Sequence, residues 1–178
     1  MVKSENNSNK KKIGILGGTF DPAHKGHLAI SKKAIKKFNL YSVIWAITKK
    51  NPFKNKGTSD LKKRIFLCKK IIKNNKLIKV KYYEDLIKSN KTVDLINHLS
   101  RNKKIELYFL MGADNLIHFH KWYKWKEVSQ KCNIIVFDRH GYKKKSLNSK
   151  TFKKLNKKQI TFVEFNKVNI SSSQLRKI

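Results

Sequence analysis

Residues 12–27 read KIGILGGTFDPAHKGH, and this stretch decides the fold. The apolar run KIGILG, residues 12–17, ends in glycine, which is typical of a buried strand followed by a tight turn. Apolar residues then recur at helical spacing from Gly26 to Phe38. The stretch therefore predicts a strand, a glycine-containing turn and a helix in direct succession.

The remainder of the chain repeats this alternation of strand and helix. Residues 49–60 and the lysine-rich residues 141–158 are aperiodic, so we expect loops there, the second one mobile. Such an alternation predicts an α/β fold, a Rossmann-like, doubly wound and mostly parallel sheet with helices on both faces. The further strands are expected at 41–47, 78–83, 105–111, 133–137 and 160–165, and the further helices at 61–73, 93–99, 116–128 (two short ones) and 171–178.

Length and composition predict one domain. The chain has 178 residues, of which 39% are apolar, enough for a single packed core. We assign residues 12–178 to this domain and residues 1–11, which lack an apolar centre, to a disordered basic tail. The sequence contains no run of 18 apolar residues and no secretory signal, so we expect a cytoplasmic protein without a membrane partner. Cys68 and Cys132 have neither metal-binding nor disulfide spacing and are expected to be buried thiols.

The charge of the chain is strongly positive. Its 43 basic and 11 acidic residues give +32, a balance that is often seen in nucleic-acid-binding proteins. Nucleic-acid readers prefer arginine for its bidentate fork, yet only four basic residues here are arginine: Arg64, Arg101, Arg139 and Arg176. We interpret the lysines as a solvated surface that attracts small anions, and we expect no nucleic-acid partner. A basic nucleic-acid-binding protein is kept as the alternative from another functional class.

The segment Gly17–His27 has the features of a phosphate-binding turn. Its two adjacent glycines let the backbone approach a ligand, and its proline directs the chain into the helix. His24 and His27 share one face of the first helical turn, where N–H groups and the helix dipole favour an anion. Zinc binding by the two imidazoles is the alternative, but Asp21 is the only further ligand nearby. Neither GxxxxGK[ST] nor GxGxxG occurs in the chain.

A second cluster, NISSSQLR at 169–176, lies near the other end of the chain. Its three serines offer hydroxyl and N–H groups before a short helix, and Arg176 can clamp phosphate oxygens as a fork. Taken alone, the pattern also fits a merely capped terminal helix. Together, the two clusters predict that the ends of the chain meet to form one site for a triphosphate.

GGTFDPAHKGH and ISSSQLR resemble the motifs of the HxGH-type nucleotidyltransferases. Between them, YFLMGADNLIHFHKWYKWK from Tyr108 and VFDRHG from Val136 are similar to the GADNL–FHxW–VxxRxG series of the bacterial nicotinate-nucleotide adenylyltransferases. NPFK at 51–54 and KTVDL at 91–95 match further segments of that family, and the resemblance covers about residues 12–176. The chain differs in having RHG at 139–141 where the family has RPG, KT at 91–92 where it has YT, and an end soon after the serine motif.

The resemblance implies a reaction of ATP with nicotinate mononucleotide that gives deamido-NAD and pyrophosphate. The acceptor phosphate is itself the nucleophile, so catalysis rests on positioning and charge stabilisation and needs no general base. The implied catalytic residues are His24 and His27, as donors to the α- and β-phosphates, and Arg176 on the pyrophosphate side. The implied ATP-binding residues are Gly17, Gly18, Thr19, Phe20, Gly112, Asp114, Ser172 and Ser173, and the implied acceptor-binding residues are Asp21, Lys54, Thr92, Trp122, Tyr123 and Arg139.

Some of these assignments compete with structural roles. Asp114 is expected to accept hydrogen bonds from a ribose, its alternative being a helix N-cap. Trp122 and Tyr123 are expected to offer a ring face to the pyridine, their alternative being core packing. Mg²⁺ is expected to be bridged by the ATP phosphates, with no protein ligand. Another phosphorylated acceptor, such as phosphopantetheine, is the alternative within the enzyme class.

Overall fold

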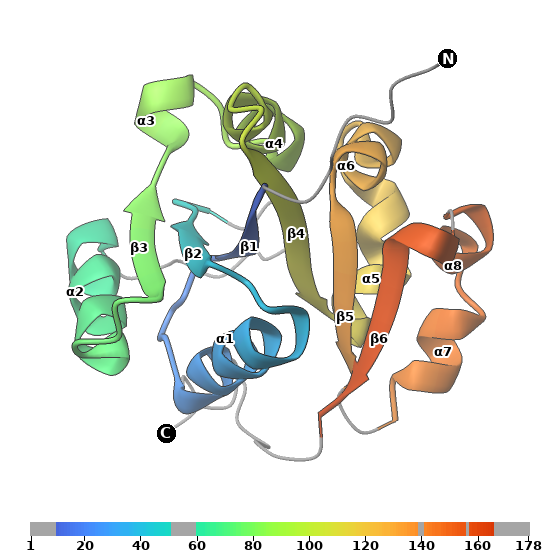
Figure 1. Ribbon diagram of the computed structural model, residues 1–178, viewed down its shortest axis with the longest axis horizontal. Helices are drawn as coiled ribbons and strands as arrows, with labels where there is room; N and C mark the ends of the chain where they lie inside the picture. The colour runs from blue at the N-terminus through green and yellow to red at the C-terminus, as the bar shows by residue number, and fades with distance from the viewer. Residues whose placement is uncertain (1–9, 51–59, 139–140, 156, 166–178) are drawn as a thin grey trace.

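The computed structural model describes residues 10–50, 60–138, 141–155 and 157–165, so most of the predicted tail and the predicted helix at 171–178 lie outside the described residues. The described strands form one sheet in the order β3-β2-β1-β4-β5-β6, and every neighbouring pair is parallel. Figure 1 shows this sheet between two layers of helices. The strands are β1 (Lys11–Gly18), β2 (Ser42–Ile47), β3 (Ile78–Tyr82), β4 (Ile105–Gly112), β5 (Asn133–Asp138) and β6 (Ile160–Glu164).

The strand order confirms the predicted doubly wound, Rossmann-like α/β fold. The chain runs outward from β1 through β2 to β3, returns to place β4 beside β1, and continues to β5 and β6 on the other side. The order therefore reverses between β1 and β4. In sheets of this kind, a crevice forms at such a reversal outside the carboxyl ends of the strands.

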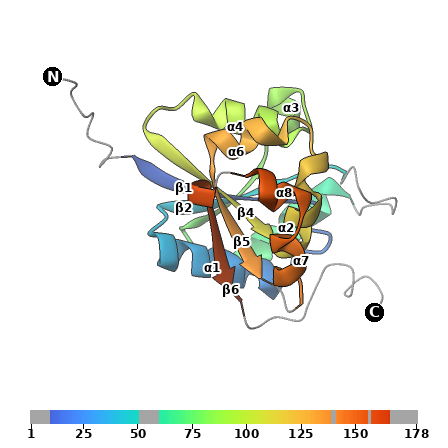
Figure 2. The ribbon, with the colours of Figure 1, turned by 90° about the vertical axis from the view of Figure 1, so that its right-hand side faces the viewer.

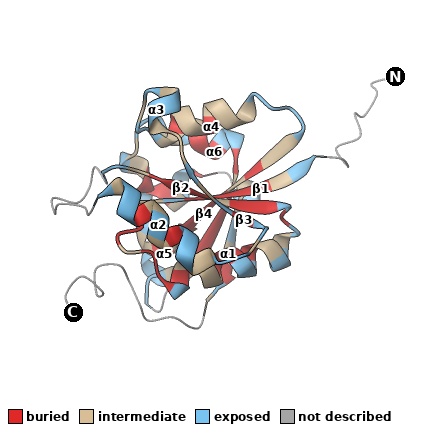
Figure 3. Cartoon of the chain, turned by 90° about the vertical axis from the view of Figure 1, so that its left-hand side faces the viewer, coloured by how far each residue is buried: buried red, intermediate tan, exposed pale blue. Residues whose placement is uncertain are grey.

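The helices cover both faces of the sheet, as predicted. One hydrophobic cluster packs α1 and α2 against one face, and another packs α4, α5 and α6 against the other. Figures 2 and 3 show α1 and α4 on opposite sides of the sheet. No helix in the described part of the chain is long and apolar enough to cross a membrane. The helices of these layers are α1 (Lys25–Phe38), α2 (Leu61–Ile72), α4 (Thr92–Ser100), α5 (Ala113–His118) and α6 (Trp125–Lys131), joined by α3 (Glu84–Ile87) and the 3₁₀ helix η2 (Phe119–Lys121).

Alternating side chains of each central strand enter the two hydrophobic clusters. In β4, Leu107, Phe109 and Met111 face the cluster of α4, α5 and α6. Tyr108 and Leu110, between them, face the cluster of α1 and α2. A strand buried on both faces must be apolar at nearly every position, which is why β4 reads as a continuous hydrophobic run.

The prediction of a mobile loop at 141–158 is wrong. Ser149 caps a helix here by accepting a hydrogen bond from Phe152 N at 3.2 Å. Thr151 is fully buried, and its hydroxyl accepts a hydrogen bond from His120 N at 3.1 Å. Because several of the buried positions are small hydroxyl residues among lysines, the hydrophobic pattern shows no helical period. The elements of this segment are α7 (Lys143–Leu147), α8 (Lys150–Lys154) and the 3₁₀ helix η3 (Lys157–Gln159).

Both cysteines are buried, as predicted. Cys68, in α2, and Cys132, before β5, are 0% and 3% exposed. Burial raises the pKa of the Cys68 thiol to about 12, an effect that the charge of Arg64 partly opposes. Burial likewise raises the pKa of the Cys132 thiol to about 12. Both groups therefore stay protonated at neutral pH.

We expect the folded protein to react slowly with a thiol reagent at pH 8, whereas the unfolded chain exposes two reactive thiols. In the folded protein, the pKa of each cysteine thiol lies above its value of about 8.5 in the unfolded chain. The contribution of the thiols to stability is therefore complete below about pH 8.5 and is lost as the pH rises toward 12. The check is a time course of thiol modification with and without denaturant. Rapid modification of both thiols in the folded protein would contradict the burial.

Candidate active site

The predicted phosphate-binding turn lies at the reversal of strand order. Gly17 and Gly18 end β1, and the turn leads directly into α1. Gly112 ends β4, the neighbour of β1 on the other side of the reversal. The sheet thus brings the turn close to the segment that begins at Gly112, as expected for the crevice of a doubly wound fold.

The turn places Phe20 in an unusual conformation. Its φ of 49° lies in the left-handed region, which a bulky residue rarely adopts. Its ring is 2% exposed and stacks on Trp45 with a centroid distance of 5.0 Å and an interplanar angle of 15°. A Cβ on Gly18 would lie 3.6 Å from the Phe20 ring and 3.8 Å from Phe20 N. Glycine at this position therefore keeps the approach to the Phe20 N–H uncovered.

The two histidines cap the start of α1. His24 Nδ1 accepts a hydrogen bond from Gly26 N at 3.1 Å, and His27 Nδ1 accepts one from His24 N at 3.2 Å. This is a reciprocal capping box built from imidazoles. Because each Nδ1 is an acceptor, the neutral rings carry their hydrogen on Nε2. Both side chains are thereby set as Nε2–H donors.

Aromatic contacts fix the orientation of the imidazoles. The ring centroids of His24 and His27 are 3.8 Å apart, and that of Phe20 lies 4.8 Å from His27. Trp45 meets His27 edge-on at 5.9 Å and donates its Nε1–H to Ser31 Oγ at 2.8 Å. Ser31 in turn donates to the carbonyl of His27 at 2.9 Å. Side chains of α1 and β2 therefore support the imidazole pair on the side of the sheet.

The start of α1 suits a phosphate group. The helix has 14 residues and no acidic residue in its first turn, so no carboxylate of the helix itself lies at its positive dipole end. His24 is buried, whereas His27 is only half-buried. Two imidazole donors at such a helix end offer directed hydrogen bonds to anionic oxygens.

Arg64 belongs to this region, although no motif in the sequence indicates a role for it. It lies in the first half of α2 and is 2% exposed. Its Nη1 donates to the carbonyl oxygens of Thr19 at 2.7 Å and Thr48 at 2.8 Å, and its Nη2 donates to that of Lys49 at 3.1 Å. The available signal was compositional, because arginine is rare in a chain whose other cations are almost all lysine.

The loop after β2 is held from a second side by α3. The Glu84 carboxylate accepts hydrogen bonds from the hydroxyl of Thr48 and from Lys49 N, the latter at 3.2 Å. Thr48 N also donates to the carbonyl of Gly18 at 3.0 Å. The end of β1 is thus joined directly to the loop that follows β2.

Gly112 and Asp114 lie where β4 ends and α5 begins. Gly112 is the N-cap of α5, and Asp114 lies in its first turn, so Asp114 is not the N-cap that was considered for it. Its Oδ1 is buried and accepts no hydrogen bond from the residues that the structure describes. A buried carboxylate oxygen without a donor is costly, which favours a ligand that supplies one.

Comparisons with known proteins agree with this geometry. Residues 15–178 match the family model described as cytidylyltransferase-like. A probable nicotinate-nucleotide adenylyltransferase of Pelagibacter ubique (strain HTCC1062) is 66% identical over 100% of both chains. The chain belongs to the nicotinate-nucleotide adenylyltransferase family. A further probable member, from Clostridium novyi (strain NT), is 38% identical over 93% of this chain and 86% of the relative.

Solved structures of nicotinate-nucleotide adenylyltransferases share the fold. The Plasmodium falciparum nicotinic acid mononucleotide adenylyltransferase complexed with NaAD superposes with a TM-score of 0.78 at 22% identity, covering 94% of this chain and 83% of that one. A putative nicotinate-nucleotide adenylyltransferase from Vibrio parahaemolyticus gives a TM-score of 0.63 at 20% identity, with 94% and 85% covered. At these identities the likeness supports the architecture alone.

The residues predicted to bind the acceptor in the nicotinate-nucleotide adenylyltransferase site are spread over separate elements, unlike those of the turn after β1. Thr92 begins α4, and Tyr123 is 58% exposed. Trp122 is half-buried, with edge-on contacts to Phe109 at 6.0 Å and Phe119 at 5.2 Å, so its ring takes part in core packing. Of the residues predicted for the site, Gly17, Gly18, Thr19, Phe20, Asp21, His24 and His27 lie on one turn, and Gly112 and Asp114 lie at the end of β4 and in the first turn of α5. Lys54, Arg139, Ser172, Ser173 and Arg176 lie outside the described residues.

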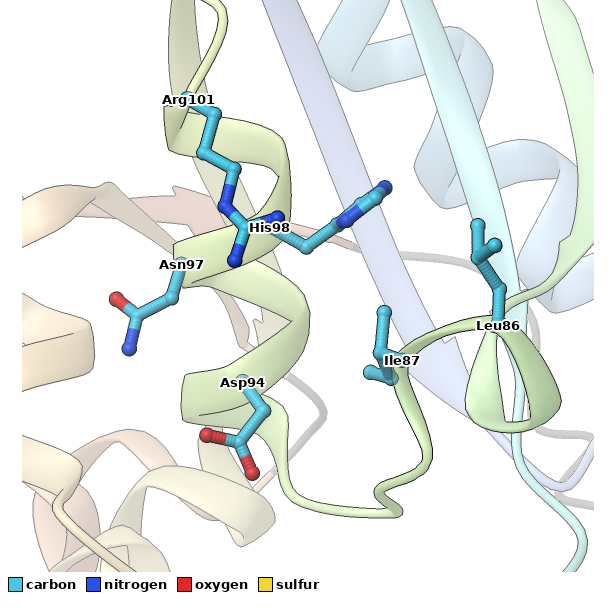
Figure 4. Close-up of a pocket in the computed structure, with 6 residues that line it drawn as sticks. All are labelled: Leu86, Ile87, Asp94, Asn97, His98 and Arg101. Atoms are coloured by element: carbon cyan, nitrogen blue, oxygen red, sulfur yellow. The ribbon is translucent and has the colours of Figure 1, made fainter.

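A surface cavity of about 480 Å³ lies elsewhere, between α3 and α4. Figure 4 shows the side chains of these two helices that border it. Among the residues that the structure describes, none of those predicted for the nicotinate-nucleotide adenylyltransferase site lines this cavity. Its lining consists of Leu86, Ile87, Asp94, Asn97, His98 and Arg101.

Proposed function

We propose that this protein transfers the adenylyl group of ATP to nicotinate mononucleotide. An oxygen of the acceptor phosphate forms a bond to the α-phosphorus, and the bond from that phosphorus to the oxygen bridging to the β-phosphorus breaks. Pyrophosphate leaves with the electron pair, and deamido-NAD remains. Family membership over the full chain gives the reaction class. The observation that carries the chemistry is the pair of imidazoles that cap α1 through their Nδ1 atoms.

The imidazoles act by charge stabilisation. Negative charge builds up on the oxygens of the transferring phosphoryl group and of the leaving pyrophosphate. Nε2–H donors that are already oriented by the capping box stabilise this charge without reorganising during the reaction. We assign His27 as the more important donor, with His24 beside it.

No side chain has to remove a proton from the nucleophile. The acceptor phosphate is already anionic at neutral pH, so a general base has no task here. The protein has instead to bring two anions together, and the dipole of α1 and the general positive charge of the chain favour this. Catalysis therefore rests on positioning and electrostatics.

The remaining roles are proposed from the resemblance and from position. Asp114 accepts a hydrogen bond from a ribose hydroxyl, which supplies the donor that its Oδ1 lacks among the described residues. Trp122, Tyr123 and Thr92 form the pyridine side. The other proposed contacts are Lys54 and Arg139 to the acceptor and Ser172, Ser173 and Arg176 to the β- and γ-phosphates.

Magnesium is proposed to enter as a complex with ATP. The residues that the structure describes contain no group of three or more histidine, cysteine or acidic side chains arranged to hold a metal ion. No step is assigned to the ion. We further propose a cytoplasmic location and no nucleic-acid partner.

A pyrophosphate-release assay tests the proposed function. With ATP, we expect nicotinate mononucleotide to give equal amounts of pyrophosphate and deamido-NAD. Nicotinamide mononucleotide and phosphopantetheine serve as comparison acceptors. Faster turnover of either one would replace the acceptor assigned here, and no pyrophosphate with any acceptor would contradict the enzyme assignment. Tight, steeply salt-dependent binding of an oligonucleotide in the absence of turnover would favour the nucleic-acid alternative.

A further inference from the structure

Arg64 places a guanidinium in the protein interior. It shares the buried face of α2 with Cys68, four residues further along the helix. Burying a cation is costly unless hydrogen bonds satisfy it. Here three backbone carbonyl oxygens accept from it, with donor–acceptor distances of 2.7 to 3.1 Å. The three hydrogen bonds therefore satisfy the buried guanidinium and hold it in one position.

The three carbonyls come from two different loops. Thr19 belongs to the turn after β1, while Thr48 and Lys49 follow β2, the neighbouring strand. Arg64 therefore ties together two loops at the carboxyl edge of the sheet. These contacts place the start of α2 at this edge, and the Asp60 side chain caps the helix there by accepting from Lys63 N at 3.2 Å.

The contact with Thr19 determines the direction of the next N–H group. The Thr19–Phe20 peptide is trans, and in a trans unit the C=O and N–H point in opposite directions. With the Thr19 oxygen turned toward Arg64, the Phe20 N–H points away from it. Within the described residues, that N–H donates no hydrogen bond. The glycine at position 18 leaves it uncovered.

We propose that Arg64 is a positioning residue that fixes the Thr19–Phe20 peptide and so aims the Phe20 N–H at a substrate phosphate. The inference rests on the proposed function, because it takes the turn to bind phosphate during adenylyl transfer. The left-handed φ of Phe20 makes this support necessary, since the conformation is unfavourable by itself. Arg64 also supplies a desolvated positive charge behind the turn.

Lysine cannot take over this role. Arginine presents its donors on separate nitrogens in a rigid planar fork. Here Nη1 serves Thr19 and Thr48 and Nη2 serves Lys49, so the fork spans the gap between the loops. A lysine ammonium concentrates its donors on one atom at the end of a flexible chain. Arg64→Lys therefore keeps the positive charge but loses the pair of donor nitrogens that spans the two loops.

The test compares steady-state kinetics of Arg64→Lys with those of the wild-type protein. We expect kcat to fall about 10- to 100-fold, the cost of misplacing a group that must align on the transition state. KM for each substrate should change far less, because ground-state binding draws on many other contacts. Thermal melts establish that each variant is folded at the assay temperature.

Two variants serve as matched controls. Arg101→Lys makes the same substitution at an exposed arginine at the end of α4 and should leave kcat unchanged. Cys68→Ala removes a buried thiol from the same face of α2 while keeping the Arg64 guanidinium, and should lower the melting temperature while leaving kcat unchanged. A kcat loss in Cys68→Ala equal to that in Arg64→Lys would mean that α2 acts through stability alone, which overturns the proposal.

The remaining outcomes are equally decisive. If the wild-type protein is active and Arg64→Lys is folded with kcat within threefold of it, the Arg64 proposal fails while the proposed function stands. If the wild-type protein releases no pyrophosphate, the proposed function itself fails. Should Arg64→Lys not fold, the amide spectrum of ¹⁵N-labelled wild-type protein with deamido-NAD decides. The Phe20 amide resonance should then shift while that of Lys104, at the opposite edge of the sheet, stays in place; an unmoved Phe20 resonance overturns the proposal.

Discussion

Replacing His27 by alanine should lower kcat/KM about 100- to 1000-fold, the usual cost of removing one donor that stabilises charge in a transition state. The substitution removes the Nε2–H donor that the capping box orients. Initial rates of deamido-NAD formation measure the effect. The exposed His118, at the end of α5, provides a control, because its replacement by alanine should leave the rate unchanged.

Two further variants separate the chemistry of His27 from its structural role. His27→Ala also removes the acceptor of the His24 N–H, at a cost of about 1 kcal/mol in helix capping. An asparagine places a polar atom near the position of Nδ1 and should restore stability without activity. A glutamine reaches toward the position of Nε2 and should recover part of the rate. Near wild-type turnover in folded His27→Ala would reject the role given to this imidazole.

Replacing Trp45 by alanine should lower the free energy of unfolding by about 3–5 kcal/mol, as expected for deleting a large buried ring. Trp45 is 0% exposed, stacks on Phe20 and donates to Ser31. Urea denaturation followed by far-UV circular dichroism measures the loss. We also expect lower activity in the variant that remains folded, because Phe20 and His27 lose their support.

Two further variants, Trp45→Phe and Tyr41→Ala, serve as comparisons for the stability loss in Trp45→Ala. The first keeps a ring but removes the donor to Ser31, so we expect a smaller loss of about 1–3 kcal/mol. The second removes an aromatic ring that is 53% exposed and lies under the Lys11 ammonium, with a cost below about 1 kcal/mol. A loss below 1 kcal/mol in Trp45→Ala would contradict the packing described here.

The strands, and the turn that leads into α1, were predictable because their signals are local. Strand β4 is apolar from Leu107 to Met111 because helices cover both of its faces, so its burial is visible directly in consecutive residues. The turn at Gly17–His27 combines glycines, proline and histidines within eleven positions. Its placement at the reversal of strand order then follows from the general geometry of doubly wound sheets.

The contacts of Arg64 could not be predicted in this way. Its partners Thr19 and Thr48 lie 45 and 16 residues away in the sequence, and they are recognised through main-chain oxygens that every residue possesses. The tautomer of the imidazoles was equally hidden, because it depends on which backbone N–H each ring meets. Helices α7 and α8 were missed for a related reason, since buried Ser146 and Thr151 carry no hydrophobic signal.

The carbonyl partners of Arg64 bear on how the chain tolerates its lysine- and asparagine-rich composition. A substitution at position 19, 48 or 49 replaces the side chain and keeps the peptide oxygen, so these positions can change identity while their carbonyls still accept from the same guanidinium. The constraint then falls on a single amino acid in α2. A protein built in this way can change the identity of these loop residues and keep the arrangement of its loops, provided that this one arginine is retained.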